Sequence, residues 1–280
     1  MRVPLVDVGR RGRLDLTFSV QNGQTVLHHS YCEVPFKITR LLNSRAQAAH
    51  LILMHVTAGI FGGDDLASSI RVERGARVLI TQQSATKIHP SGGRLAKQYN
   101  QIVVESEAEL QFYLEPMIPF AESRLRQVTR IDVQPGGRLM FWEAFMAGRI
   151  GRGERWQFRE LAVETSLYSD NILLYLDRFQ LPNGLQDSAW AMGDCAYVGT
   201  GLYVGPQAQH FASVLHGNMP AAGVDHPSQD LAVTRVVSVS GPDFYRCREM
   251  FTSMHDGSVS AVEEFDGQKN RSPDDFEAGA

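Results

Sequence analysis

Cysteine is scarce in this sequence, and its three cysteines, Cys32, Cys195 and Cys247, lie far apart. An odd number without a Cys-x-x-Cys pair argues against a structural zinc site and fits a reducing compartment. Cys247 falls on the apolar side of a predicted helix, so we expect a buried small hydrophobe there rather than a reactive thiol.

Long apolar runs and an excess of one charge are also missing. Residues 1–14 carry arginines but no apolar core of a signal peptide, and no segment reaches the roughly 20 residues that cross a bilayer. The formal net charge of −4 argues against a protein held to nucleic acid by phosphate contacts. The simplest expectation is a cytoplasmic protein.

The common catalytic and metal-binding motifs are absent as well. No Lys-Ser/Thr follows the glycines of residues 59–63, which excludes a phosphate loop, and the nine histidines form neither H-x-x-x-H nor H-E-x-x-H. A closed metal site therefore cannot be inferred from spacing, although histidines such as His55 and His89 could still meet in space. Most histidines are better interpreted as surface or satisfied core residues.

What is present is a pattern of alternating apolar residues that repeats. The segments IRVERGARVLI (70–80), IVVESEAELQF (102–112) and IDVQPGGRLMF (131–141) each contain two short strands around a turn. A period of about thirty residues is typical of stacked supersecondary units. The sequence therefore predicts a mostly β, stacked-strand or β-helix-like single domain, over residues 1–262.

Other elements follow from local patterns. Asn22-Gly23 predicts a hairpin within residues 14–27, and Asp170-Asn171 predicts a second one. The apolar run 50–56 is typical of a strand buried on both faces. Two helices are expected near the C-terminus, at 207–216 and 242–254, with a strand at 231–240 between them. The polar tail, residues 263–280, is expected to be disordered.

Polar residues in unusual places are the candidates for function. The run Thr81 to Lys87 ends a strand with consecutive uncharged hydrogen-bonding side chains, which predicts either a solvated rim or a wet interior. Carboxylates also sit among large apolar residues, where an unpaired charge is costly. One interpretation pairs each with an arginine such as Arg149, Arg152 or Arg155; the other places them along a hydrated passage with Thr81, Gln83 and Ser84. These carboxylates are Glu115, Glu143 and Glu154.

The order of several motifs resembles the urease accessory protein UreD family, called UreH in some operons. The resemblance extends from about Gly12 to Gly257 and is carried by Gly62-Gly63-Asp64-Asp65-Leu66, Gly75-Ala76, Thr81-Gln82, Thr86-Lys87, Glu115 to Phe120, Gly148-Arg149 and Gly153-Glu154. The family commonly has Thr-Lys-Val-Tyr-Arg where this chain has Thr86-Lys87-Ile88-His89-Pro90, so the function of that arginine is missing or supplied elsewhere.

The resemblance implies a non-catalytic chaperone of the nickel enzyme urease. It implies binding to UreF, through UreF to the GTPase UreG, and docking onto apo-urease, with no tightly bound cofactor and with nickel in transit through an interior tunnel. Our hypothesis is that a transient polar path for the metal is formed by Asp64, Gln83, Glu115, Glu143 and Glu154. The predicted C-terminal helices would contribute to a partner surface.

Two other functions remain open on the sequence alone. A β-helical carbohydrate-active enzyme would need paired carboxylates about 5–10 Å apart in an open cleft, and no series of groove-lining aromatic residues favours it. A protein-binding scaffold without metal traffic would need no polar path at all.

Overall fold

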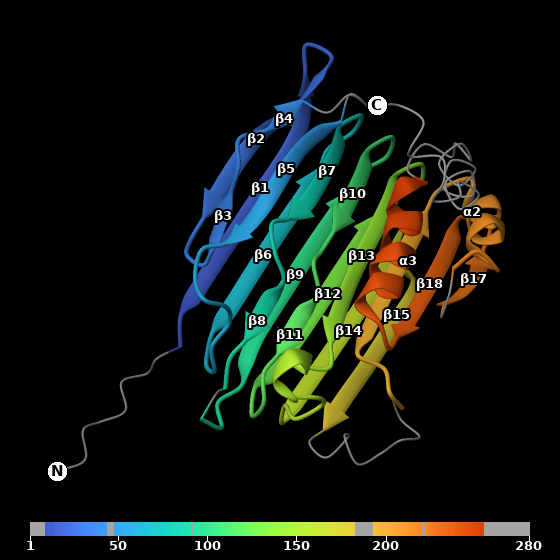
Figure 1. The fold of residues 1–280 in the computed structure, drawn as a ribbon. Helices are drawn as coiled ribbons and strands as arrows, with labels where there is room; N and C mark the ends of the chain where they lie inside the picture. The colour runs from blue at the N-terminus through green and yellow to red at the C-terminus, as the bar shows by residue number, and fades with distance from the viewer. Residues whose placement is uncertain (1–8, 44–47, 91, 183–192, 220–221, 255–280) are drawn as a thin grey trace, which may run out of the picture.

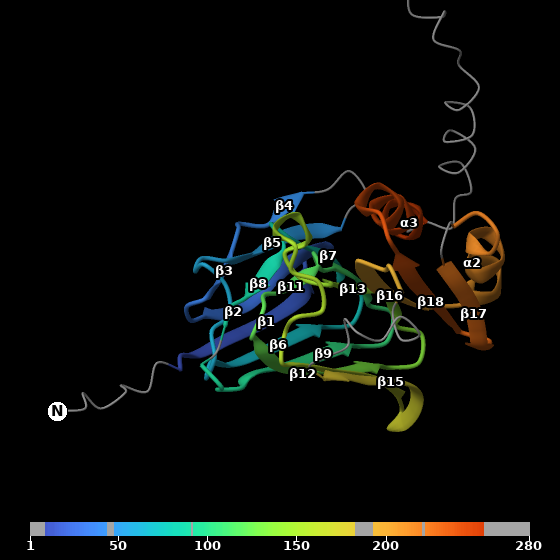
Figure 2. The same cartoon turned by 60° about the horizontal axis from the view of Figure 1, so that its bottom comes forward.

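Two β-sheets packed face to face form the body of the protein (Figure 1; Figure 2). The structure is a computed structural model that describes residues 9–43, 48–90, 92–182, 193–219 and 222–254. The main core cluster contains buried side chains from both sheets, including Leu16, Ile70, Ile80 and Phe141. The layered β architecture predicted from the repeat is therefore present. The predicted tail at 263–280 lies outside the described residues.

Within the described residues, one sheet has seven strands and the other has eleven. The seven-stranded sheet contains, in spatial order, β15 (Ile172–Pro182), β14 (Glu160–Ser169), β12 (Arg124–Val133), β9 (Ala96–Val104), β6 (Asp65–Val72), β1 (Arg11–Gln21) and β2 (Gln24–Cys32). The path of the eleven-stranded sheet is β17 (Ala222–Ser228), β18 (Leu231–Ser238), β16 (Tyr197–Val204), β13 (Arg138–Met146), β10 (Glu109–Tyr113), β7 (Arg77–Gln82), β5 (Ala49–His55) and β3 (Phe36–Ile38). Beside that path lie β4 (Leu42–Asn43), β8 (Thr86–Ile88) and β11 (Met117–Pro119).

The sequence repeat builds both sheets at once. In each of its three units the first strand (β6, β9, β12) joins the seven-stranded sheet and the second (β7, β10, β13) joins the other, and equivalent strands pair in parallel. The turn between them needs a left-handed residue at the same place each time: Gly75 (φ 76°), Glu107 (φ 63°) and Gly136 (φ 80°). Successive units therefore stack in register, as the thirty-residue period predicted.

Both predicted hairpins are confirmed, at β1–β2 and β14–β15. The run 50–56 behaves differently from the prediction of a strand buried on both faces, because β5 alternates buried with half-buried residues. The helices that cover the outer side of this sheet make most of their contacts with β16, β17 and β18 instead. Local hydrophobicity alone does not show which part of a sheet a helix covers.

The two C-terminal helices, α2 (Ala208–Leu215) and α3 (Gly241–Ser253), bury part of the outer face of the eleven-stranded sheet. Phe244 and Phe251 of α3 pack on Trp142 of β13, and Cys247 is fully buried beside them, as predicted. A Cβ on Gly201 of β16 would lie 2.4 Å from the Phe251 ring, so this close packing requires glycine. In the described part of the chain, no helix is long and apolar enough to cross a membrane.

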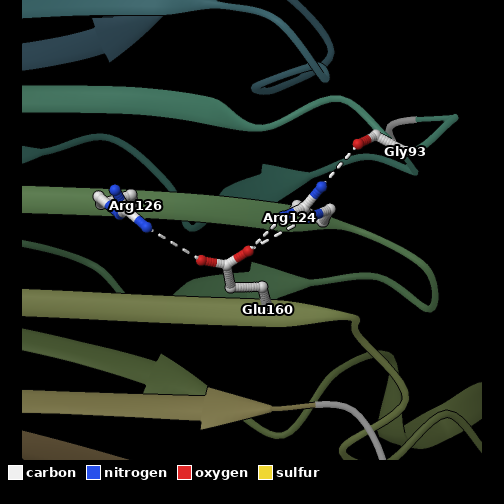
Figure 3. A network of polar contacts seen from close by, with 4 residues as sticks. All are labelled: Gly93, Arg124, Arg126 and Glu160. Atoms are coloured by element: carbon white, nitrogen blue, oxygen red, sulfur yellow. Dashed lines mark hydrogen bonds and ion pairs between the residues drawn. The ribbon is translucent and has the colours of Figure 1, made fainter.

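The outer face of the seven-stranded sheet carries ion pairs across neighbouring strands. Figure 3 shows Glu160 of β14 between Arg124 and Arg126 of β12, with Arg124 also donating to the Gly93 carbonyl at 2.7 Å. Pairs that face solvent contribute little to stability, about 0–1 kcal/mol each. Polar side chains on the opposite, inward side of the same strands have no such access to water, and they form the candidate site.

Candidate functional site

A cavity lies in the interior of the sandwich, between the two sheets. Its free space of about 40 Å³ has room for a few water molecules. The apolar part of the lining includes Phe36, Ile70, Phe112 and Phe141. The polar part comes from both sheets and from the segments beside β8 and β11: His55, Ser68, Gln82, Thr86, Gln98, Asn100, Glu115, Gln127, Thr129 and Glu143.

On the seven-stranded sheet, polar side chains form one row across five neighbouring strands. The strand register places Ser68, Asn100, Thr129, Thr165 and Asp177 side by side on β6, β9, β12, β14 and β15. The Ser68 hydroxyl donates to Asn100 Oδ1 at 2.8 Å, and Asn100 Nδ2 donates to Thr129 Oγ1 at 3.1 Å. We call these five residues the polar row. It continues the polar lining of the cavity toward the β15 edge.

The facing sheet supplies charges opposite the polar row. Glu143, Thr200 and Arg235 are register neighbours on β13, β16 and β18. Arg235 forms an ion pair with Asp177, and Thr165 donates a hydrogen bond to Glu143 Oε1. These two contacts join the sheets through polar groups.

Glu143 is the most deeply buried of these charged groups. Gln127 Nε2 donates to its Oε2 at 3.0 Å, and Thr165 holds the other oxygen. Burial raises the pKa of Glu143 to about 7, against the opposing effect of the two hydrogen bonds. Asp177 raises this pKa further, and Arg235 lowers it. The carboxyl group therefore exchanges a proton near neutral pH.

His55 brings a nitrogen ligand into the same cavity. Burial lowers the pKa of its imidazole to about 4, so the ring is neutral at pH 7. Its Nδ1 is buried without a hydrogen-bond partner, and the ring meets Phe36 edge-on with centroids 5.1 Å apart. The sequence showed His55 only as a residue flanking the central stretch. His55 lies at the end of β5, on the same face as the buried residues Leu51 and Leu53, and this alternation could have indicated that it lines the interior.

Glu115 connects the cavity lining to helix α3. Its Oε1 lies 2.9 Å from Arg248 of α3, and both side chains keep some solvent access. The Glu115 backbone N–H donates to Gln82 Oε1 at 3.1 Å, and Gln82 Nε2 donates to Thr86 Oγ1 at 2.6 Å. The polar run from Thr81 to Lys87 thus contributes Gln82 and Thr86 to the wall of the cavity. Arg248 was not among the arginines considered as partners from the sequence.

The other three predicted residues lie elsewhere. Gln83 is exposed, because the alternation of the chain turns Gln82 inward and its neighbour outward. Asp64 is buried in a turn, where it accepts the N–H groups of Arg10 at 3.0 Å and Phe61 at 2.8 Å. Glu154 pairs with Arg149, whose hydrogen bond lowers the pKa of that carboxyl.

The structure therefore brings together two of the five predicted residues, Glu115 and Glu143, in one cavity. The arginine pairing weighed from the sequence applies directly to Glu154. Among the described residues, no group of three or more histidines, cysteines and carboxylates is close enough to hold a metal ion. What the cavity offers is single oxygen and nitrogen ligands spread along its wall.

Comparison with known proteins identifies relatives over most of the chain. A family model described as UreD urease accessory protein matches residues 10–273. A urease accessory protein UreD of Deinococcus radiodurans is 36% identical over 206 residues, which cover 71% of this chain and 73% of the relative. One from Cupriavidus pinatubonensis is 29% identical over 235 residues, covering 80% and 81%. One from Microcystis aeruginosa is 29% identical over 197 residues, covering 70% and 73%.

Proposed function

The chain belongs to the UreD family of urease accessory proteins, and from this premise we propose that it is a non-catalytic chaperone that conducts nickel toward apo-urease. In this proposal the metal is cargo and not a resident cofactor. The expected partners are UreF, UreG bound through UreF, and the urease apoprotein, in the cytoplasm. The C-terminal helices are a proposed part of the partner surface.

The observation that carries the proposal is the polar cavity with buried Glu143 in its wall. An interior of this kind is expensive, because buried polar groups gain little over their contacts with water and a buried carboxylate costs more. An apolar lining would stabilise the sandwich better. A path for a metal cation, which the polar groups would bind in place of water, gives the polar lining a purpose.

The chemistry of the wall suits a divalent metal in passage. Imidazole is a good ligand for nickel, and amide and carboxylate oxygens bind more weakly. His55, Gln82 and Glu143 present such ligands singly, and they come from different strands. Conduction requires binding that is favourable enough for entry and weak enough for release. Separate ligands along a wall meet this requirement better than one closed site.

The test uses two neighbouring glutamines as a matched pair. Urease subunits and the other accessory proteins are co-expressed with the wild-type chain, with Gln82→Leu or with Gln83→Leu, and the nickel content of purified urease is measured. Gln82 lines the cavity and Gln83 is exposed. We expect several-fold less nickel with Gln82→Leu and a wild-type level with Gln83→Leu.

Glu143→Gln is the second variant, because it removes the charge and keeps the shape. It should also lower the nickel content, at unchanged urease abundance and unchanged recovery of the chain in its complex. Wild-type nickel loading with both Gln82→Leu and Glu143→Gln would refute the proposal that the metal passes through this cavity.

A further inference from the structure

A second hollow, of about 750 Å³, lies against the strands that wall the interior cavity. It is lined by β8, β11, the 3₁₀ helix η1 (Ile150–Arg152) and the start of α3; η1 is the short yellow-green helix at the lower end of Figure 1. β8 and β11 separate it from the interior. Thr86 and Met117 line the cavity, while the adjacent Lys87 and Ile118 line this hollow. We call it the basic cleft.

The charge of the basic cleft is opposite to that of the chain as a whole. The sequence has a formal net charge of −4, yet the described lining contains Lys87, Arg149 and Arg152 and no carboxylate. Glu154 pairs with Arg149 without lining the cleft. The N-terminal residue of α3, Gly241, also lines it, and a helix N-terminus adds partial positive charge.

The floor of the cleft is apolar and held by ring contacts. The Arg149 guanidinium lies 4.1 Å from the centroid of the Phe120 ring, and His89 stacks on Phe61 with centroids 4.4 Å apart. Val239 on the rim is 59% exposed. Aromatic and arginine side chains around an apolar centre are characteristic of protein interfaces. They are preorganised here, so little ordering would accompany binding.

We propose that the basic cleft docks an acidic segment of a urease-assembly partner, with carboxylates set around an apolar side chain. Charge complementarity selects this occupant: Lys87 and Arg152 are exposed cations that line the cleft together with apolar side chains such as Ile118. The inference rests on the proposed function and adds to it the chemistry of the partner. A partner docked there would sit one layer of strands away from the interior cavity.

Carboxylate-to-lysine crosslinking tests the contact directly. The sequence has only four lysines, Lys37, Lys87, Lys97 and Lys269, so each crosslink is assigned by mass spectrometry without ambiguity. The full-length chain is mixed with purified nickel-free urease apoprotein and, separately, with the purified complex of the other accessory proteins, then treated with a carbodiimide. We expect Lys87 to be joined to aspartate or glutamate of a partner. Exposed Lys37 on β3 is the internal control and should stay unlinked.

Charge reversal supplies the second measurement. The double variant Lys87→Glu with Arg152→Glu changes two exposed side chains, and we expect it to bind the crosslinked partner at least tenfold more weakly, with a smaller dependence on salt. Lys37→Glu should bind as the wild type does, and Lys87→Arg should retain the affinity. Circular dichroism confirms that each variant is folded.

The outcomes separate this inference from the function on which it rests. If the wild-type chain binds but the double variant binds equally well and Lys87 forms no crosslink, the basic cleft is not the docking site and the role in urease assembly stands. If the wild-type chain binds neither the apoprotein nor the accessory complex, the proposed function fails together with the inference.

Discussion

Replacing Glu143 by glutamine should stabilise the protein, and by an amount that grows with pH. Burial raises the folded-state pKa of Glu143 from the ordinary value of 4.5 to about 7. Folding therefore favours the protonated form. The stabilisation of the folded protein by the protonated Glu143 carboxyl group is fully present below pH 4.5 and is lost as the pH rises through 7. At pH 8 and above, the wild-type protein has therefore lost about 3 kcal/mol of unfolding free energy relative to low pH, as the difference between the two pKa values requires.

Glutamine at this position has no charge to bury, and its oxygen and amide group can still meet Gln127 and Thr165, since a hydroxyl both donates and accepts. The expected gain over wild type is less than about 1 kcal/mol at pH 5 and about 3 kcal/mol at pH 8.5. For a chain of this size that is a rise in Tm of roughly 6–12 °C at the higher pH.

The assay is urea unfolding of both proteins at several pH values between 5 and 8.5, followed by tryptophan fluorescence. Glu249→Gln is the matched control, because Glu249 is exposed on α3 and the same charge is removed there without a buried site around it. A gain for Glu143→Gln that does not change with pH would show that Glu143 is not titrating in the folded protein, and would refute the explanation. A loss of stability at pH 8.5 would show that the carboxylate has a stabilising cation or water partner.

Three further substitutions test the turns and the packing. Asp64→Asn should cost about 1–2 kcal/mol in urea unfolding, because a neutral amide replaces a carboxylate that accepts two backbone N–H groups; no loss would mean that these contacts are not made in solution. Gly201→Ala should cost about 1–3 kcal/mol and lower Tm, since the added Cβ meets the Phe251 ring; an unchanged Tm would contradict the packing of α3. Glu107→Gly should raise the unfolding free energy by about 0.5–1 kcal/mol by relieving a left-handed turn residue, and a loss of similar size would show that the exposed ion pair of Glu107 with Arg74 outweighs this relief.

Much of the fold is predictable from the sequence because its determinants are local. Asn22-Gly23 and Asp170-Asn171 form the turns of two hairpins, with positive φ at all four residues. The helices α2 and α3 begin and end within one residue of the predicted ranges. The thirty-residue period gave the stacking of parallel strands. Local sequence does not determine which strands a helix covers, and this explains why β5 is fully buried on one face only and not on both as predicted.

The candidate site is less predictable because it depends on which way each side chain points. Gln82 and Gln83 are the same residue type in the same polar run, yet only one faces the cavity. Glu115, Glu143 and Glu154 all lie among apolar neighbours in the sequence. Their partners come from 133, 22 and 5 residues away, respectively Arg248, Thr165 and Arg149. Spacing along the chain shows only the last of these pairs.

The polar residues of the interior nevertheless occupy equivalent positions in the sequence repeat, and this becomes apparent once the strand register is known. Ser68, Asn100 and Thr129 each stand two residues before the isoleucine that opens a repeat unit, Ile70, Ile102 and Ile131. Gln82 and Glu143 likewise stand two residues after the last residues of the first and third units, Ile80 and Phe141.

Because the units pair in parallel without offset, equal positions in the repeat become neighbours in a sheet. A side-chain period of two then turns all of them toward the interior together with the isoleucines. On the seven-stranded sheet, polarity at these positions is thus repeated in the same way as the core itself, and it keeps a polar layer continuous across strands from three successive units. On the facing sheet the pattern is interrupted, because the equivalent position in the second unit is Leu114, which also lines the cavity.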